Sequence, residues 1–359
     1  MHNLYLMTQD SGTGQFYIKA IIDKYQSFIW AERYAAYGDF ELRIDIPMVG
    51  GHNIKLDDYI RFEKSKYTMV VEDIEILRSA KESYAKITGR SIESFLDRRI
   101  IDTDFTAYNA PIAVMTGHVR DQFTPGAPVA SKRVPGFSVN FGVPPGHIPQ
   151  TRNPYTFKGK DLYTAVTTIA QDTDLGFRID LDIANGGFRF TPFRGADRAF
   201  TDIAAWSVEI GNLKQISHVN TARTYKNAAL IDFAPGDKNS DKRYVNYPAP
   251  SSRVGLARRE ILVDASSIKA KGYEDAVMQD VANALAYSDL KQAQGTFAFD
   301  AKIDENRKPF YGVDYNIGDI VLFHNDFDLR VRYRVTEYIR SYSPSGVQEY
   351  PTFEIERVE

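Results

Sequence analysis

Residues 38–46 read Gly-Asp-Phe-Glu-Leu-Arg-Ile-Asp-Ile, and this stretch decides the expected fold class. Apolar side chains alternate in it with charged ones, which is the period of two that is typical of a half-buried β-strand. The segments that follow are also rich in aromatic and β-branched residues and are separated by turn residues; they cover residues 59–62, 67–76 and 84–88. The first hundred residues are therefore predicted to form a β domain.

The composition of the whole chain agrees with a fold dominated by strands and turns. Its 359 residues include 22 Tyr, 22 Phe, 24 Gly and 16 Pro, but only 2 Trp. The net charge of −3 does not provide the basic field of a dedicated nucleic-acid binder. The absence of cysteine excludes disulfides, thiolate metal sites and a Cys nucleophile. No signal peptide and no transmembrane helix is expected.

The pattern changes along the chain and predicts four parts. Ser91 is a plausible N-cap for a short helix over 91–99. Residues 102–158 hold eight of the 16 prolines and are interpreted either as an extended arm with little regular structure or as a surface loop packed on its own domain. The predicted parts are a first β-barrel with its helix (1–101), the Pro/Gly-rich arm (102–158), a small α/β insertion (159–215), and a last region (216–359) with a helix over 273–290 and a second β-barrel over 295–359.

The α/β insertion is predicted from two changes of period. Leu162, Val166 and Ile169 recur at helical spacing, and alternation over 177–181 then indicates a strand. Asn185-Gly186-Gly187 is a strong hairpin turn.

The two ends of the chain resemble each other, which suggests an internal repeat. Gly38–Leu42 corresponds to Gly295–Phe299, and Leu56–Phe62 corresponds to Ile317–Phe323. Val70-Val71-Glu72-Asp73-Ile74 then corresponds to Arg334-Val335-Thr336-Glu337-Tyr338. The identities are few, so a chance match between two β segments is the alternative. A genuine repeat predicts two similar β modules, and three chains in a cycle would then present six modules.

Motifs for catalysis are absent or incomplete, so no catalytic, cofactor-binding or metal-binding residue is predicted. There is no G-x-S-x-G and no H-E-x-x-H, and the six histidines stand far apart. The stretches 180–182 and 237–241 faintly resemble calcium loops but lack the required ligands. A carboxylate pair for glycoside hydrolysis depends on the fold and is neither predicted nor excluded.

One charge pattern has two interpretations. Arg330, Arg332 and Arg334 alternate with apolar residues, which places them on one face of a strand. The corresponding first strand carries Glu72, Asp73 and Glu75. These charges either cover solvated faces or provide complementary contacts between neighbouring modules of a ring.

Several blocks together resemble the tail-hub (baseplate hub) proteins of long-tailed bacteriophages of the siphovirus type. These blocks are Tyr34–Leu42, Thr88–Ile92, Tyr225–Ile231, Gly255–Asp264 and Tyr315–Val321. The resemblance implies a structural, non-enzymatic virion protein of the tail tip, assembled in the bacterial cytoplasm. Such proteins look like homotrimers whose two tail-tube-like β-barrels form a pseudo-sixfold ring for DNA passage. The Pro-rich stretch 102–158 matches the family pattern least.

The resemblance also implies partners. These are the distal tail protein, the tape-measure protein and fibres or receptor-binding or lytic tip proteins, with viral DNA only in transit and no stable membrane association. Two alternatives remain open: a cell-wall or capsule glycan hydrolase, and a glycan-binding module that acts without catalysis through residues 102–158.

Overall fold

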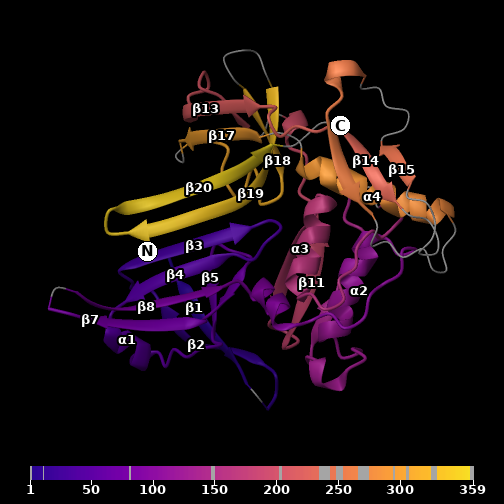
Figure 1. The fold of residues 1–359 in the computed structure, drawn as a ribbon. Coiled ribbons are helices and arrows are strands. Elements are labelled where there is room, and N and C mark those ends of the chain that lie inside the picture. The colour runs from indigo at the N-terminus through magenta and orange to yellow at the C-terminus, as the bar shows by residue number, and fades with distance from the viewer. Residues whose placement is uncertain are drawn as a thin grey trace.

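The computed structural model describes most of the chain (Figure 1). The described residues are 2–10, 12–80, 82–146, 150–201, 204–233, 243–247, 254–265, 275–293, 296–304, 307–324 and 330–355. The polar loop at 237–243, one of the two calcium-loop-like stretches, lies almost wholly outside them.

The first β module consists of two sheets that pack on one core. One sheet has the order β2-β1-β5-β6. The other sheet is shared with the second module, and its part in the first module has the order β3-β4-β8-β7. Phe28, Trp30 and Leu42 from the second sheet meet Leu6 and Phe62 from the first in this core. The element bounds are β1 Leu4–Gln9, β2 Phe16–Ile22, β3 Ser27–Arg33, β4 Asp39–Ile44, α1 Ile46–Gly51, β5 Tyr59–Phe62, β6 Thr68–Val70, β7 Asp73–Arg78 and β8 Ser83–Arg90. The strand expected over 40–46 is thereby confirmed, except that Ile46 begins α1.

The second β module combines the end of the chain with residues 204–221. Trp206, Tyr315, Phe323 and Tyr333 pack together in its core. β19 pairs with β18 along its first half and with β20 along the other edge, while β17 pairs with β13 and contacts β20. The bounds are β12 Ala205–Trp206, β13 Leu213–Thr221, β17 Thr296–Ile303, β18 Ile320–His324, β19 Arg330–Ser343 and β20 Gly346–Ile355.

The two modules repeat the same backbone hydrogen bonds. β5 pairs with β6 so that Tyr59 faces Val70, and β18 pairs with β19 so that Ile320 faces Arg334. The amide of Asp57 donates to the Val71 carbonyl at 2.9 Å, and the amide of Gly318 donates to the Val335 carbonyl at 2.8 Å.

The turn before each of these strands is also shared. Asp57 and Gly318 both have positive φ, and each is followed by an aspartate, Asp58 or Asp319, whose Oδ2 accepts a backbone amide three residues back. The repeat indicated by the sequence is thus confirmed in these segments, in the expected register.

A middle α/β unit lies between the modules in sequence and packs against the first. It contains a three-stranded sheet of order β10-β11-β9 with α2 and α3 against each other. Asp161 caps α3, because its carboxylate accepts the Thr164 amide at 2.7 Å. The bounds are η1 Ile92–Arg98, α2 Pro111–Phe123, η2 Ala130–Lys132, β9 Phe137–Val139, α3 Leu162–Asp172, β10 Gly176–Asp182, β11 Gly187–Phe193 and η3 Ala199–Thr201. The predicted helix, strand and hairpin at 162–187 are confirmed.

The expectation that 102–158 has little regular structure is wrong. Residues 111–123 form α2, a 13-residue helix that is mostly buried. Pro111 stands at its first turn, where a missing amide hydrogen costs nothing. Residues 137–139 add a parallel strand to β11. The Pro-rich segment therefore contains regular structure, which belongs to the α/β unit.

A small outer unit lies between β13 and β17 in sequence. Its sheet has the order β15-β14-β16, and α4 covers one face through Met278, Ala282 and Ala286. The bounds are β14 Ala228–Phe233, β15 Arg243–Tyr247, η4 Gly255–Ala257, β16 Glu260–Asp264 and α4 Asp275–Gln292. The helix predicted over 273–290 is confirmed, shifted by about one half-turn.

Glu93 holds η1 against the sheet of the α/β unit through a buried carboxyl. It is fully buried in η1, and its Oε1 accepts the Ile179 amide of β10 at 2.7 Å. Burial raises the pKa of Glu93 to about 7, while hydrogen bonds from Ser91 and Ile179 and the charge of Arg178 act in the opposite direction. Burial also raises the pKa of the nearby Tyr67 well above its usual range, so this side chain stays neutral.

Because the folded state holds the Glu93 proton more tightly than the unfolded state, this group stabilises fully below about pH 4.5, and that stabilisation is lost as the pH rises through 7. Glu93→Gln keeps the acceptor for Ile179 and removes the charge. We expect its free energy of unfolding to rise relative to wild type between these pH values, by about 3 kcal/mol.

Urea unfolding followed by circular dichroism at several pH values measures this difference. The matched control is Glu82→Gln at an exposed position, which should show no such trend. A stability difference for Glu93→Gln that does not change with pH would contradict the assignment.

Candidate assembly interface

The two β modules are joined edge to edge within one chain. The second half of β19 pairs antiparallel with β3, with Glu337 opposite Arg33 and Tyr342 opposite Phe28. A hydrogen-bonded sheet therefore runs without interruption through β20-β19-β3-β4-β8-β7 (Figure 1). We call the β3–β19 contact the internal seam. It converts two open strand edges into a ladder, so neither edge is available for unspecific pairing.

A buried ion pair lies at the centre of the internal seam. Arg340 of β19 and Glu32 of β3 are each 2% exposed, and Nη1 lies 2.5 Å from Oε1. Trp30 Nε1 donates to Glu32 Oε1 at 3.2 Å, and Tyr311 Oη donates to Oε2 at 2.6 Å. The carboxylate is thus fully engaged, as a buried charge requires.

Aromatic rings complete the surroundings of Arg340. Its guanidinium carbon lies 4.7 Å from the ring centre of Tyr338, 5.0 Å from that of Tyr311 and 5.4 Å from that of Phe62. Burial and the neighbouring Glu32 carboxylate raise the pKa of Tyr311 well above its usual range, so Tyr311 remains a hydrogen-bond donor. Charge, donors and rings from both modules must all be in place together, which favours a single register.

Tyr34 fixes the point where three units meet. Its backbone amide donates to the Thr336 carbonyl at 2.9 Å, and its hydroxyl donates to the Asp174 carbonyl at 2.9 Å. A Cβ at Gly176 would lie 2.3 Å from the Tyr34 ring, and one at Gly318 would lie 2.4 Å from it. Burial raises the pKa of Tyr34 to about 12. Glycine at these two positions therefore lets β10 and the turn before β18 approach the ring.

The arginine row of β19 does not form a solvated face. Arg334 is buried, donates to the Gly318 carbonyl at 2.9 Å and lies over the Tyr34 ring. Arg332 pairs with Asp197 of the same chain. The side chain of Arg330 lies outside the described residues. The solvated interpretation is therefore wrong for Arg334, and Arg332 has a partner within its own chain.

Two of the three acidic residues singled out in the first module also have partners within the chain. Glu72 pairs with Arg90 at 2.8 Å, and Glu75 pairs with Lys86 at 2.9 Å. Complementary charge between modules does occur, but at a pair that the sequence pattern did not single out. Arg33 Nε lies 2.7 Å from Glu337 Oε1, across the internal seam.

The continuous sheet that crosses the internal seam has one polar face. Arg33, Asp39, Glu41 and Arg43 alternate with the buried residues of β3 and β4, so they lie on the face away from the core. Arg33 pairs with Asp39 at 2.5 Å and Arg43 with Glu41 at 2.8 Å, so the cations of this face are engaged by neighbouring carboxylates.

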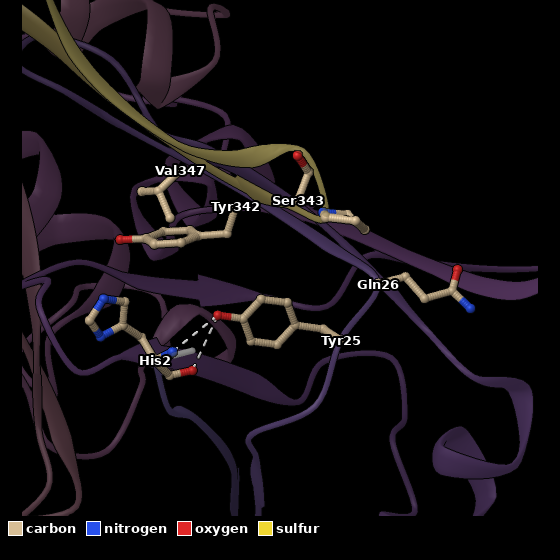
Figure 2. A pocket seen from close by; sticks show the side chains of 7 residues that line it. His2, Tyr25, Gln26, Tyr342, Ser343 and Val347 are labelled. Carbon is tan, nitrogen blue, oxygen red and sulfur yellow. Dashed lines mark hydrogen bonds between the residues drawn. The ribbon is translucent and has the colours of Figure 1, made fainter.

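A small aromatic pocket opens at one end of the internal seam (Figure 2). It has a volume of about 240 Å³ and is lined by His2, Tyr25, Gln26, Tyr342, Ser343, Pro344 and Val347. The hydroxyl of Tyr25 bonds the backbone of His2, and that of Tyr342 donates to Glu349. The lining residues include no carboxylate, so this pocket does not supply the acid pair of a glycoside hydrolase.

The described residues show neither a metal cluster nor a membrane helix. No group of three His, Cys, Asp or Glu among them is placed to hold a metal ion. In the same part of the chain, no helix is both long and apolar enough to cross a membrane.

The buried ion pair gives a direct test of the internal seam. Arg340→Met leaves the Glu32 charge buried and unpaired, and should lower the free energy of unfolding by about 3–5 kcal/mol. Adding Glu32→Gln removes that charge while keeping an acceptor, so the double variant should recover a large part of the loss. Urea unfolding followed by tryptophan fluorescence measures both.

The half-exposed pair at the same seam is the matched control. Glu337→Gln leaves Arg33 near water and beside Asp39, and should cost less than about 1 kcal/mol. Strictly additive losses in the Glu32 and Arg340 double variant would contradict the coupling.

Comparison with known proteins gives the family and the fold. The model of the Siphovirus ReqiPepy6 Gp37-like protein family matches residues 13–353. A comparison with curated proteins found no match. Among solved structures, the tail protein from Neisseria meningitidis MC58 has a TM-score of 0.56 at 11% identity and covers 98% of this chain and 96% of its own.

Two further structures share the fold. The prophage tail protein gp18 from Listeria monocytogenes EGD-e has a TM-score of 0.56 at 13% identity and covers 99% of this chain and 94% of its own. A chain of the Francisella PdpA-VgrG complex has a TM-score of 0.53 at 9% identity and covers 98% of this chain and 54% of its own. The family match spans nearly the whole chain and the fold is that of phage tail proteins; this chain belongs to the Siphovirus ReqiPepy6 Gp37-like family and is a phage tail protein.

Proposed function

We propose that this protein is the hub subunit of the tail tip, and that three copies form a ring that closes the tail tube. The observation that carries the proposal is the internal seam, at which two repeated β modules are already joined edge to edge in one sheet. A cycle of three chains with two modules each presents six similar modules. Such a ring is threefold by sequence and nearly sixfold by shape, so it adapts a sixfold tube to a threefold tip.

Ring closure follows from two open strand edges, one on the sheet of the first module and one on the β13-β17 pair of the second. In the described part of the chain β7 pairs only with β8, and β13 pairs only with β17. Both strands present unpaired backbone groups, which a soluble protein must cover. Head-to-tail contacts between copies cover them in every chain when the ring closes.

The polar face of the sheet suits the wall of a DNA channel. Cations of this face are engaged by carboxylates of the same or the neighbouring strand, as Arg43 is by Glu41 and Lys86 is by Glu75. Free cations would bind the phosphate backbone and slow its passage. A mixed, internally paired face and a net charge of −3 provide little such binding. We infer that this face lines the channel.

The ring position implies partners of the kinds that the family resemblance suggests. These are a distal tail protein on one side, a tape-measure protein inside and fibres or a receptor-binding or lytic protein at the tip. The fold is found in a chain of the Francisella PdpA-VgrG complex, which supports an architecture that can assemble with other proteins. The aromatic pocket at the seam is lined by no carboxylate, so it gives no support to a glycan-hydrolysing enzyme.

Mass in solution tests the ring. Multi-angle light scattering of the purified protein at increasing concentration should approach three times the chain mass of 40.7 kDa. Negative-stain images should show closed rings with six lobes. A twofold dimer, or a monomer at every concentration, would contradict the proposal.

A further inference from the structure

We propose that the β7 edge of one chain pairs with the β13 edge of a second copy, in the register that places Asp73 opposite Arg223 of that copy. We call this contact the external seam. The inference rests on the proposed ring and names the strands and the residues that close it. It is derived from the internal repeat, because the internal seam shows how two modules of this kind join.

The first step is that β7 is the equivalent of the second half of β19. The matched bonds Asp57–Val71 and Gly318–Val335 place Val71 and Val335 at the same position. Counting forward from them, Asp73 corresponds to Glu337. The next ladder agrees, since Asp73 faces Thr88 in β8 and Glu337 faces Thr352 in β20.

The second step is that β13 is the equivalent of β3. β3 pairs with β4 so that Ala31 faces Asp39, and β13 pairs with β17 so that Thr221 faces Thr296. Asp39 and Thr296 occupy the same place in the repeat, because each stands between a glycine and a phenylalanine in sequence. Ala31 therefore corresponds to Thr221, the last residue of β13. Two residues further on, Arg33 corresponds in sequence to Arg223, which lies in the turn that follows β13.

With these two equivalences, the register of the internal seam predicts the register of a contact between two copies. Glu337 opposite Arg33 becomes Asp73 opposite Arg223. The first is an ion pair of 2.7 Å, and the second brings together an exposed carboxylate and an exposed guanidinium of opposite charge. The two strands lie apart within one chain, with β13 in the upper part of Figure 1 and β7 at the lower left.

Apolar surface on β7 supports the same contact. Ile76 is 55% exposed, although it corresponds to Arg340, which is 2% exposed inside the internal seam. A second strand placed on the β7 edge would cover Ile76 as β3 covers Arg340. In the transferred register Ile74 faces Ala222, where the internal seam has Tyr338 opposite Glu32. The external seam is thus expected to be closed by apolar contacts and one outer ion pair, without a buried charge.

The absence of cysteine permits a register-specific cross-link. Leu77→Cys and Val219→Cys, placed in one chain, stand opposite each other across the proposed external seam. Their equivalents across the internal seam are Ile29→Cys and Ser341→Cys, which face each other within one chain. Opposed strand positions bring the Cβ atoms within disulfide reach.

Mild oxidation and non-reducing electrophoresis measure the result. The Leu77/Val219 variant should give covalent dimers and trimers at a rate comparable to the formation of the intrachain disulfide in the Ile29/Ser341 control. The shifted pair, Leu77→Cys with Ser217→Cys, should cross-link at least several-fold more slowly, because strand register moves opposed positions apart by two residues.

Charge exchange provides an independent readout. Asp73→Arg and Arg223→Asp should each weaken self-association by about two- to fivefold, and the double variant should restore it. If the protein forms trimers but cross-links no faster at Leu77/Val219 than at the shifted pair, the external seam is wrong. That result would leave the proposed trimeric ring unaffected. Failure of the unmodified chain to form trimers would instead overturn the ring itself.

Discussion

An open strand edge must be paired, and in this protein that constraint organises the whole chain. The internal seam satisfies it once, by joining β3 to β19 across the boundary between two modules. Tyr34 continues the same strand into the junction, where it contacts β19 through its amide and the α/β unit through its hydroxyl. The relative position of all three units therefore follows from a strand of seven residues and the tyrosine after it.

The duplicated modules share their backbone turns and strand pairing, and they differ in the side chains at their strand edges. Both retain the turn with positive φ, the aspartate that accepts an amide and the ladder that follows. They differ at the edges. The second module carries a buried arginine at the position where the first carries the exposed Ile76. A buried ion pair fits a permanent contact within one chain, because it enforces one register. An apolar edge with an outer ion pair fits a contact formed between chains during assembly.

Local pattern predicted much of the fold. The alternation around Phe40, the stripe of α3 and the Asn185 turn all proved reliable, since each depends on residues close in sequence. The repeat was visible for the same reason. The helix over 111–123 was missed because prolines on both sides suggested a loop, whereas Pro111 only marks the first turn of α2.

The central contacts of the seam could not be predicted. Glu32 and Arg340 lie about three hundred residues apart and look like ordinary surface charges in the sequence. Arg334 likewise seemed to belong to a solvated row, yet it is buried against Tyr34. Burial depends on which distant strands meet, and that is decided by packing of the complete fold and not by local composition.

Electron cryomicroscopy of the assembled protein, reconstructed without imposed symmetry, tests the central claim most directly. The account predicts three chains around one axis and six equivalent β modules, with the polar face of the β3–β4 sheet toward the channel and β7 of each chain beside β13 of the next. A closed assembly in which the modules meet through other strands, or in which that polar face points outward, would contradict it.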